Sequence, residues 1–305
     1  MLFNECFDTL VLVSDHPFNL KGSRVVKRIN SSRNCLAPAP VLIAADPFLV
    51  VKDDTLYLFY EEYRYRAKGI IKMTSTQDLV TWSGPRVVLE QEFHLSYPWV
   101  FQHNDQWYMI PETSATHEIR LYKAVDNSLN RFEYLKTLLT HDGNDQYPLI
   151  DYCDSSIVEK NGTFFLFTTL HHGAGNELHL FYSDALDGNY TPHPMSPVFV
   201  NDECGRNGGH LLEHDGALYR FAQNCNGGYG NNISIFEVAE LSHSQYKETL
   251  VQKNALTQAG LSAGHQYNFV KFMDKYIIAI DQKRRFPFLT CKVKHIFSMI
   301  KSRSH

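Results

Sequence analysis

Two aspartates at corresponding points of a sequence repeat are the residues best suited to chemistry in this chain. Asp46 begins one repeat and Asp154 begins another. If both carboxyl groups face one pocket, different surroundings can separate their pKa values, so that one acts as an acid and the other as a base. Glycoside chemistry needs such a pair. An aspartate can also cap a turn at the start of a strand, and that alternative stays open for each of them.

Two glutamates form a second corresponding pair. Glu61 and Glu112 end the second predicted strand of the first two repeats, and Gln223 stands at the same point of the fourth. One of the glutamates could be a proton donor. The alternative is a carboxylate at the rim of a site, held by an arginine such as Arg64 or Arg206.

Two glycine-rich segments could approach a ligand closely. Arg206 and His210 flank the first, where Arg206 could hold a carboxylate or phosphate and His210 could help it. Tyr229 lies in the second, Asn226–Gly230. Neither is a phosphate-binding loop, because no Gly-Lys-Ser/Thr follows, and a plain glycine-rich turn is the alternative for both.

His265 begins the fifth repeat, where it could bind a central ion, contact a sugar hydroxyl or satisfy a hydrogen bond in the core. The other histidines show no spacing typical of a zinc protease, and the six cysteines contain no C-x-x-C pair. Apart from an ion near His265, the sequence therefore suggests no metal or cofactor.

The fold must bring these side chains together, and the sequence contains a repeat that can do so. Five segments start alike near residues 46, 97, 154, 208 and 265, which are 51 to 57 residues apart. Each contains four short strands rich in aromatic and β-branched residues, separated by turn signals. The pattern predicts an all-β chain that folds as a five-bladed β-propeller with four-stranded antiparallel blades. A β-sandwich, the alternative, needs no such period. A strand at residues 9–13 could complete the last blade and close the ring.

The first strand of a propeller blade lies nearest the axis, so the repeat starts should line one axial cup. We expect Asp46, Tyr97, Asp154 and His265 to meet there. Aromatic side chains stack on sugar rings, and we expect this of Tyr97, Trp99 and Tyr229.

Composition narrows the remaining choices. The formal net charge of −4 gives no support for nucleic-acid binding. No stretch approaches the ~20 apolar residues of a spanning helix, and residues 1–8 do not read as a secretory signal, which favours the cytoplasm. We assign residues 1–282 to the propeller and 283–305 to a basic tail, predicted to be a short helix. This tail could pack on the propeller, fray, or touch anionic lipid weakly at the inner face of a membrane.

Several segments resemble a known family. The first repeat and the segment Ser75–Trp82 are similar to the propellers of glycoside hydrolase families 43 and 32. A closer resemblance, over about residues 40 to 282, is to the propeller domain of glucosamine inositolphosphorylceramide transferases and of bacterial relatives linked to polysaccharide synthesis. The segments that carry it are Ala45–Leu49, Tyr97–Phe101, Trp107–Glu112, Phe165–Thr169 and Tyr219–Cys225.

The resemblance to family 43 implies a base aspartate in blade one, a second aspartate in blade two and an acid glutamate in blade three. Asp46 matches the first, but Tyr97 and Asp154 stand at the other two points, so the hydrolase triad does not carry over whole. In the plant-type transferases a separate domain is thought to carry the transfer chemistry, and we recognise none in this sequence.

Three functions stay open. The first is a glycosyltransferase of surface-glycan or glycolipid synthesis, with a sugar donor and a glycan or glycolipid acceptor as partners. There Asp46 would be the base and Asp154 or Glu112 its acidic partner. The second is a glycosidase that uses Asp46 and a glutamate. The third is a glycan-binding module without catalysis.

Overall fold

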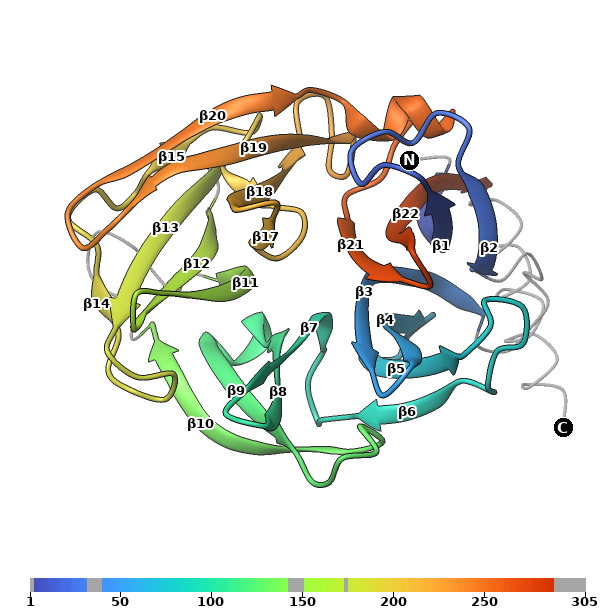
Figure 1. The fold of residues 1–305 in the computed structure, drawn as a ribbon, viewed down its shortest axis with the longest axis horizontal. Helices are drawn as coiled ribbons and strands as arrows, with labels where there is room; N and C mark the ends of the chain where they lie inside the picture. Colours follow the sequence, from blue (N-terminus) through green and yellow to red (C-terminus); the bar gives the residue numbers. More distant parts are fainter. Residues whose placement is uncertain (1–2, 32–39, 142–150, 173–174, 288–305) are drawn as a thin grey trace, which may run out of the picture.

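The computed structural model describes residues 3–31, 40–141, 151–172 and 175–287, and nearly all of its regular structure is β-strand. The sheets stand side by side around a central axis, with one strand of each near the centre and the others further out (Figure 1). In the described part of the chain the only helices are two short 3-10 turns, η1 (Ser114–Thr116) and η2 (Ala255–Ala259). None of the described helices is long and apolar enough to cross a membrane.

The strands pair antiparallel with their neighbours in sequence. The first half of the chain contributes β3 (Val41–Lys52), β4 (Thr55–Arg64), β5 (Gly69–Thr76), β6 (Arg86–Leu89), β7 (Ser96–His103), β8 (Gln106–Glu112), β9 (Glu118–Ala124) and β10 (Phe132–Thr140). The third and fourth repeats contribute β11 (Asp151–Lys160), β12 (Thr163–His172), β13 (Gly175–Ser183), β14 (Thr191–Pro192), β15 (Phe199–Val200), β16 (Arg206–Asn207), β17 (Leu212–His214), β18 (Ala217–Asn224), β19 (Asn232–Leu241) and β20 (Tyr246–Gln252).

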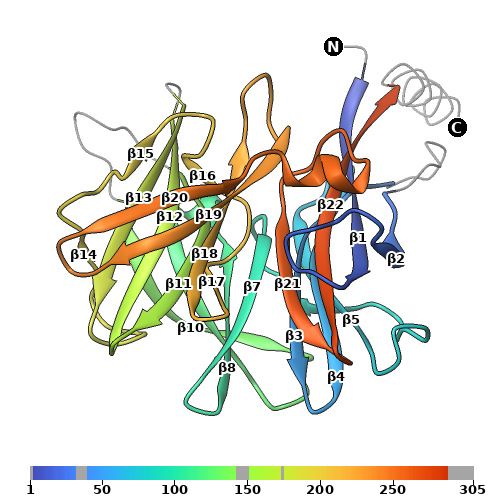
Figure 2. The same cartoon turned by 45° about the horizontal axis from the view of Figure 1, so that its top comes forward.

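The two ends of the chain share one sheet. It contains β1 (Phe3–Ser14), β2 (Arg24–Ile29), β21 (Tyr267–Phe272) and β22 (Lys275–Pro287). β1 pairs antiparallel with β22 over its whole length (Figure 2). A single parallel pair, Phe7 with Ile43, joins this group to β3–β6, so the connected sheet has eight strands.

The predicted strand at residues 9–13 is therefore present and does join the last repeat. It is longer than predicted because its partner β22 continues to Pro287. Residues 283–287, which we assigned to the tail, are part of that strand. Residues 288–305, which hold the rest of the predicted basic helix, lie outside the described residues.

The turn between the first two strands of each repeat has the same backbone form. Both central residues have a positive φ, as in the two-residue hairpin turns that match the twist of the strands. The pairs are Asp53-Asp54, Asn104-Asp105, Asn161-Gly162, Asp215-Gly216 and Met273-Asp274. Asn, Asp and Gly tolerate this region best, which explains the composition of these turns.

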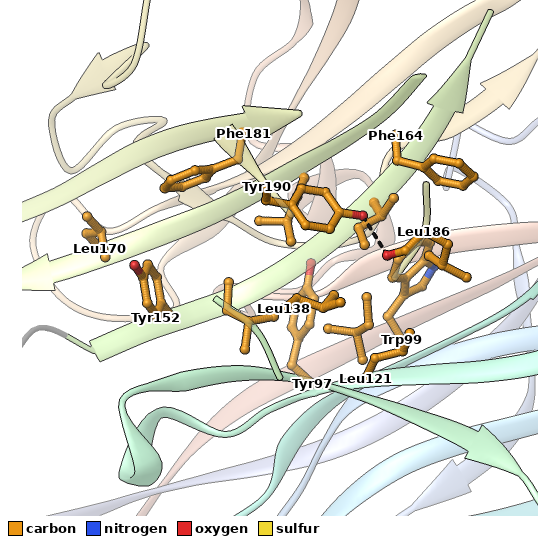
Figure 3. Close-up of a cluster of buried hydrophobic side chains, with 14 of the residues drawn as sticks. Tyr97, Trp99, Leu121, Leu138, Tyr152, Phe164, Leu170, Phe181, Leu186 and Tyr190 are labelled. Carbon is orange, nitrogen blue, oxygen red and sulfur yellow. Dashed lines mark hydrogen bonds between the residues drawn. The ribbon is translucent and has the colours of Figure 1, made fainter. Parts of the chain in front are cut away.

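Five clusters of buried apolar side chains lie between the strands of adjacent repeats. Figure 3 shows one of them, where Trp99 and Leu121 from β7 and β9 meet Phe164 and Phe181 from β12 and β13. No sheet could bury these faces alone, so the ring is held together by contacts between adjacent repeats.

Candidate functional site

A bulge in the innermost strand marks the same point in three repeats. Asp46, Tyr97 and Asp154 all have a left-handed φ, between 47° and 51°. At each of them, two residues of the innermost strand lie opposite a single residue of the next strand. A non-glycine residue in this region is uncommon, and such strained positions gather at functional sites. The structure thus confirms that the three residues correspond.

The three bulges surround a small cavity of about 170 Å³ at one end of the axis. Its walls come from every repeat and from β1. They consist of Phe7, Ile43, Asp46, Glu61, His94, Ser96, Glu112, Asp154, Arg206, Tyr229 and His265. We call this cavity the axial cup. Seven of the eleven residues singled out from the sequence line it.

Asp46 is held as a carboxylate. Its Oδ2 accepts the backbone N–H of Tyr97 at 3.0 Å, and its Oδ1 lies 3.1 Å from Nε2 of His265. Burial alone would raise the pKa of Asp46, but His265, the Tyr97 N–H and Arg206 outweigh it and lower the pKa. Asp46 is therefore suited to act as a base or to stabilise positive charge.

His265 is held between two carboxylates. Its Nδ1 lies 2.7 Å from Oδ2 of Asp281, in an ion-pair contact that is not aligned as a hydrogen bond. Burial would lower the pKa of His265, but Asp281 and Asp46 outweigh it and raise the pKa well above the ordinary value. The imidazole is thus a fixed cation beneath Asp46.

The same atoms would have to bind the ion suggested by the sequence. Ligand atoms of Asp46, His265 and Asp281 lie within 4.8 Å of one another. A histidine binds metal through a neutral ring, whereas both nitrogens of His265 face carboxylates and its pKa is raised. These residues fit a protonated histidine better than a metal site.

Asp154 lies in a different environment. Its Oδ2 accepts hydrogen bonds from Nε of Arg206 at 2.7 Å and from Nε2 of Gln223 at 3.1 Å. Burial raises the pKa of Asp154 well above its usual range, Arg206 opposes this, and the negative charges of Glu112 and Asp46 add to the rise. Asp154 and Asp46 share one cup but have pKa values shifted in opposite directions.

Glu112 connects the second and third repeats. Its Oε2 accepts the backbone N–H of Asp154 at 3.2 Å and lies 4.0 Å from Arg206. The other arginine considered from the sequence, Arg64, pairs with Glu62 at 2.8 Å and not with Glu61.

Glu61 and His94 form a pair at one side of the cup. Nε2 of His94 lies 3.2 Å from Oε1 of Glu61, and Nδ1 of His94 accepts the backbone N–H of Gly69 at 3.0 Å. Burial raises the pKa of Glu61 to about 7, an effect that His94 opposes and the charge of Asp46 supports. Near neutral pH Glu61 can therefore both give and take a proton.

Tyr229 lies at the rim and is 40% exposed. Its ring centroid is 5.0 Å from the Arg206 guanidinium and 5.0 Å from the His265 ring. The exposed ring leaves the predicted contact with a sugar possible in geometry, and that contact stays a prediction.

Two predicted stacking residues do not line the cup. Tyr97 is fully buried, and its hydroxyl accepts the N–H of Gly209 at 3.1 Å. Trp99 is 5% exposed and stacks on Phe101 at 4.2 Å. Both belong to the apolar cluster between repeats two and three (Figure 3). The prediction that they stack on a sugar is wrong, because neither has an open ring face in the cup.

Two further predicted site residues, Gln223 and His210, do not line the cup. Gln223 is buried behind Asp154 and donates to it. His210 stacks near Trp99, with ring centroids 6.0 Å apart, and burial lowers its pKa to about 4. A neutral histidine outside the cup cannot hold a negatively charged donor group, so that prediction for His210 is corrected.

Three important residues were missed from the sequence. His94 lies in the connection before β7, Asp281 lies in β22 and Phe7 lies in β1. Asp281 could have been found from its place in the fifth repeat, because it lies six residues after the start of β22, as Glu61 lies six residues after the start of β4. No repeat position marks His94 or Phe7.

Comparisons with known proteins identify the family of this chain. A family model described as "Glucosamine inositolphosphorylceramide transferase 1, N-terminal" matches residues 27–271. The chain is 34% identical over 234 residues to the glucosamine inositolphosphorylceramide transferase 1 of Oryza sativa subsp. japonica, covering 73% of this chain and 30% of the relative. With the Arabidopsis thaliana protein of the same name it shares 34% over 220 residues, or 70% of this chain and 28% of the relative. The chain thus spans less than a third of these relatives.

Solved structures show the fold. A xylan β-1,4-xylosidase from Bacillus halodurans has a TM-score of 0.55 at 17% identity, covering 75% of this chain and 48% of the enzyme. A family 117 glycoside hydrolase from Zobellia galactanivorans has a TM-score of 0.56 at 11% identity, covering 90% of each chain. At such identities the likeness extends to the β-propeller fold alone, which agrees with the resemblance seen in the sequence.

Proposed function

This chain belongs to the family of the N-terminal domain of glucosamine inositolphosphorylceramide transferase 1, and we propose that its axial cup binds a sugar unit and forms a glycosidic bond to it. The reaction would serve the synthesis of a glycolipid or a surface polysaccharide. The sugar donor and a glycan or glycolipid acceptor are the partners. The relatives' name, which refers to a transferase and to a glycolipid, supports this direction of reaction.

We propose in addition that the ring has five four-stranded blades. Dividing the eight-stranded sheet at its one parallel pair leaves the group β21-β22-β1-β2 and the group β3–β6. The other three sheets, β7–β10, β11–β15 and β16–β20, correspond to the second, third and fourth repeats. The first two strands of all five repeats are joined by turns of the same backbone form. On this division β1 is the third strand of the last blade.

The observation that carries the proposal is the opposite shift of two carboxyl pKa values in one small cavity. Asp46 has a lowered pKa and Asp154 a raised one. Separated pKa values of this kind divide acid and base roles. Asp46 removes the proton from an acceptor hydroxyl, and the acid is one of the carboxyl groups kept protonated by burial, Asp154 or Glu61.

The other groups of the cup bind and orient the sugar. Arg206, Glu112 and Tyr229 surround the space beside Asp154 and offer a charged donor, an acceptor and a ring face. The cavity is below the ~300 Å³ at which pockets for drug-sized ligands begin, so we expect it to take a single sugar ring. In the basic residues 288–305, which follow β22, we propose a weak contact with anionic lipid, which vesicle flotation can test.

The test is a sugar panel offered to the purified full chain. Nucleotide-activated and lipid-linked sugars are supplied with glycolipid and oligosaccharide acceptors, and binding and transfer of labelled sugar are measured. Transfer supports the proposal. A protein that binds none of these sugars and transfers none of them contradicts it.

Two specific observations keep other functions open. The solved structures that share the fold are mostly glycoside hydrolases, which favours hydrolysis through Asp46 and a glutamate. Release of reducing sugar from a glycan panel would identify this activity. The chain also spans only 30% of its relative's length, which favours a glycan-binding module whose chemistry lies elsewhere. Tight sugar binding that no single carboxyl substitution changes would identify that role.

A further inference from the structure

Glu61 differs from Asp154 in the donors that hold its carboxyl group. The Oδ2 atom of Asp154 accepts hydrogen bonds from Arg206 and Gln223, and donors of this kind favour the charged form of a carboxyl group. Glu61 lines the cavity and is 4% exposed. Its Oε1 is enclosed, and Nε2 of His94 lies 3.2 Å from it in a contact that is not aligned as a hydrogen bond. The Glu61 carboxyl group therefore faces the cup without the paired donors that hold Asp154.

The surroundings of Glu61 fix where that oxygen points. His94 approaches Oε1 from the mouth of the cup, where its side chain is 39% exposed. Since Nδ1 of His94 accepts the Gly69 N–H, the ring carries its proton on Nε2, the atom nearer Glu61. Gly69 leaves room for both side chains, because a Cβ there would lie 2.8 Å from Oε1 of Glu61 and 2.7 Å from Cε1 of His94.

We propose that Glu61 is the catalytic acid of the cup and that His94 is its positioning residue. This rests on the proposed function. The O–H bond of Glu61 breaks, and its proton goes to the sugar oxygen that leaves the anomeric carbon with the bonding electron pair. The acceptor oxygen bonds to that carbon and gives its own proton to Asp46. The His94 Nε2–H then stabilises the new Glu61 carboxylate.

The charged groups around Glu61 set the pH at which this acid works. Asp46 on β3 raises its pKa, whereas His94 and His265 lower it, and burial dominates. The other groups of the cup that titrate or carry charge are Glu112, Asp154, Arg206 and Tyr229. On the opposite face of β4, Glu62 is occupied by Arg64 and Lys72. With a pKa of about 7, Glu61 is protonated below neutrality and loses its proton above it.

The experiment compares wild type with Glu61→Gln, His94→Leu, His94→Gln and the control Glu92→Gln. Glu92 is a fully exposed carboxylate on the same connection as His94. Sugar binding and turnover are measured from pH 5 to 9, and the carboxyl groups are titrated by carbon-13 NMR on glutamate-labelled protein without ligand.

We expect wild-type turnover to fall as the pH rises through about 7. Glu61→Gln should bind sugar within about threefold of wild type but lose turnover by roughly 10²- to 10⁴-fold. The fall in turnover at high pH, which is the basic limb of the pH profile, should disappear in this variant. His94→Leu keeps the site dry but removes the donor, so the basic limb and the Glu61 titration should move up by about one pH unit. His94→Gln retains a donor, so its pH profile and its Glu61 titration should return most of the way to those of wild type. Glu92→Gln should match wild type.

The outcomes separate the two proposals. Sugar turnover that survives Glu61→Gln within threefold overturns the assignment of the acid and leaves the proposed function intact. An unchanged basic limb in His94→Leu overturns the positioning role. A wild-type protein that neither binds nor turns over any sugar overturns the proposed function and this inference with it.

Discussion

Asp46 and Asp154 occupy corresponding bulges, yet their surroundings shift their pKa values in opposite directions. The reason is the partner that each repeat supplies. A protonated His265, supported by Asp281, stabilises the charge on Asp46. Burial raises the pKa of Asp154, and the negative charges of Glu112 and Asp46 add to the rise, so that the Arg206 guanidinium opposes it only in part. Corresponding positions therefore acquire different chemistry because the residues around them differ from one repeat to the next.

At the scale of single residues, Asp46→Asn is expected to remove turnover by roughly 10²- to 10⁴-fold without unfolding the protein. Asparagine tolerates the left-handed φ of 49° and keeps an oxygen for the Tyr97 N–H. It cannot accept a proton, however. Sugar transfer assays measure the loss of turnover, and the thermal unfolding midpoint of the same preparations shows whether the variant stays folded.

The matched control is Asp53→Asn, the same substitution at an exposed position with a φ of 46°. It should leave both turnover and the thermal midpoint unchanged. An Asp46→Asn protein that works like wild type would show that this carboxylate is not the base.

At the scale of elements, the strands that carry the two chain ends are joined by one buried carboxylate. Asp8 on β1 accepts hydrogen bonds from the backbone N–H of Ser31 at 2.8 Å and from its hydroxyl at 2.7 Å. It also pairs with Arg284 on β22 at 2.9 Å. β1 therefore contacts β22 and the end of β2 through polar groups as well as through the strand ladder.

We expect Asp8→Ala to lower the free energy of unfolding by roughly 3 kcal/mol, because it leaves buried donors and an arginine without their partner. Urea denaturation measures this change. The control Asp15→Ala removes an exposed partner of Lys275 and should have little effect. Equal effects of both variants would show that Asp8 does not hold the strands together.

At the scale of the whole molecule, the ring should unfold as a unit. Its five apolar clusters lie between repeats, so opening the ring at one place exposes two sheet faces. β1 closes that ring, and Leu10 on it is 1% exposed. Trp99 and Trp107 belong to clusters that contain no residue of β1 and report on other parts of the ring, whereas Trp82 packs on the cluster that contains Val11 of β1.

Leu10→Ala is therefore expected to lower the free energy of unfolding by about 2–5 kcal/mol. The denaturation midpoints seen by tryptophan fluorescence and by far-ultraviolet circular dichroism should fall together. Val25→Ala, at a position 45% exposed on β2, is the control and should change neither. A fluorescence midpoint that stays in place while the dichroism midpoint falls would mean that the repeats unfold independently.

The sequence by itself determined the repeat, the hairpin turns, the strand that joins the two ends and the meeting of Asp46, Asp154 and His265, whereas Tyr97, expected with them, does not line the cup. These follow from local patterns, since strand alternation, turn residues and a constant period depend on neighbours along the chain. The family followed from the same segments.

Only the tertiary structure decided which groups in the cup pair and which side chains face it. Tyr97 occupies the same bulge as Asp46 and Asp154, but its ring packs on Phe48 and its hydroxyl accepts the Gly209 N–H, so Tyr97 lies in the core. His94 pairs with Glu61 of the preceding repeat, and Asp281 pairs with His265 of its own repeat. The contact between His265 and Asp46 joins the last repeat to the first and exists only once the ring has closed. Protonation depends on burial and on charges gathered from every repeat, and no local pattern of residues encodes that sum.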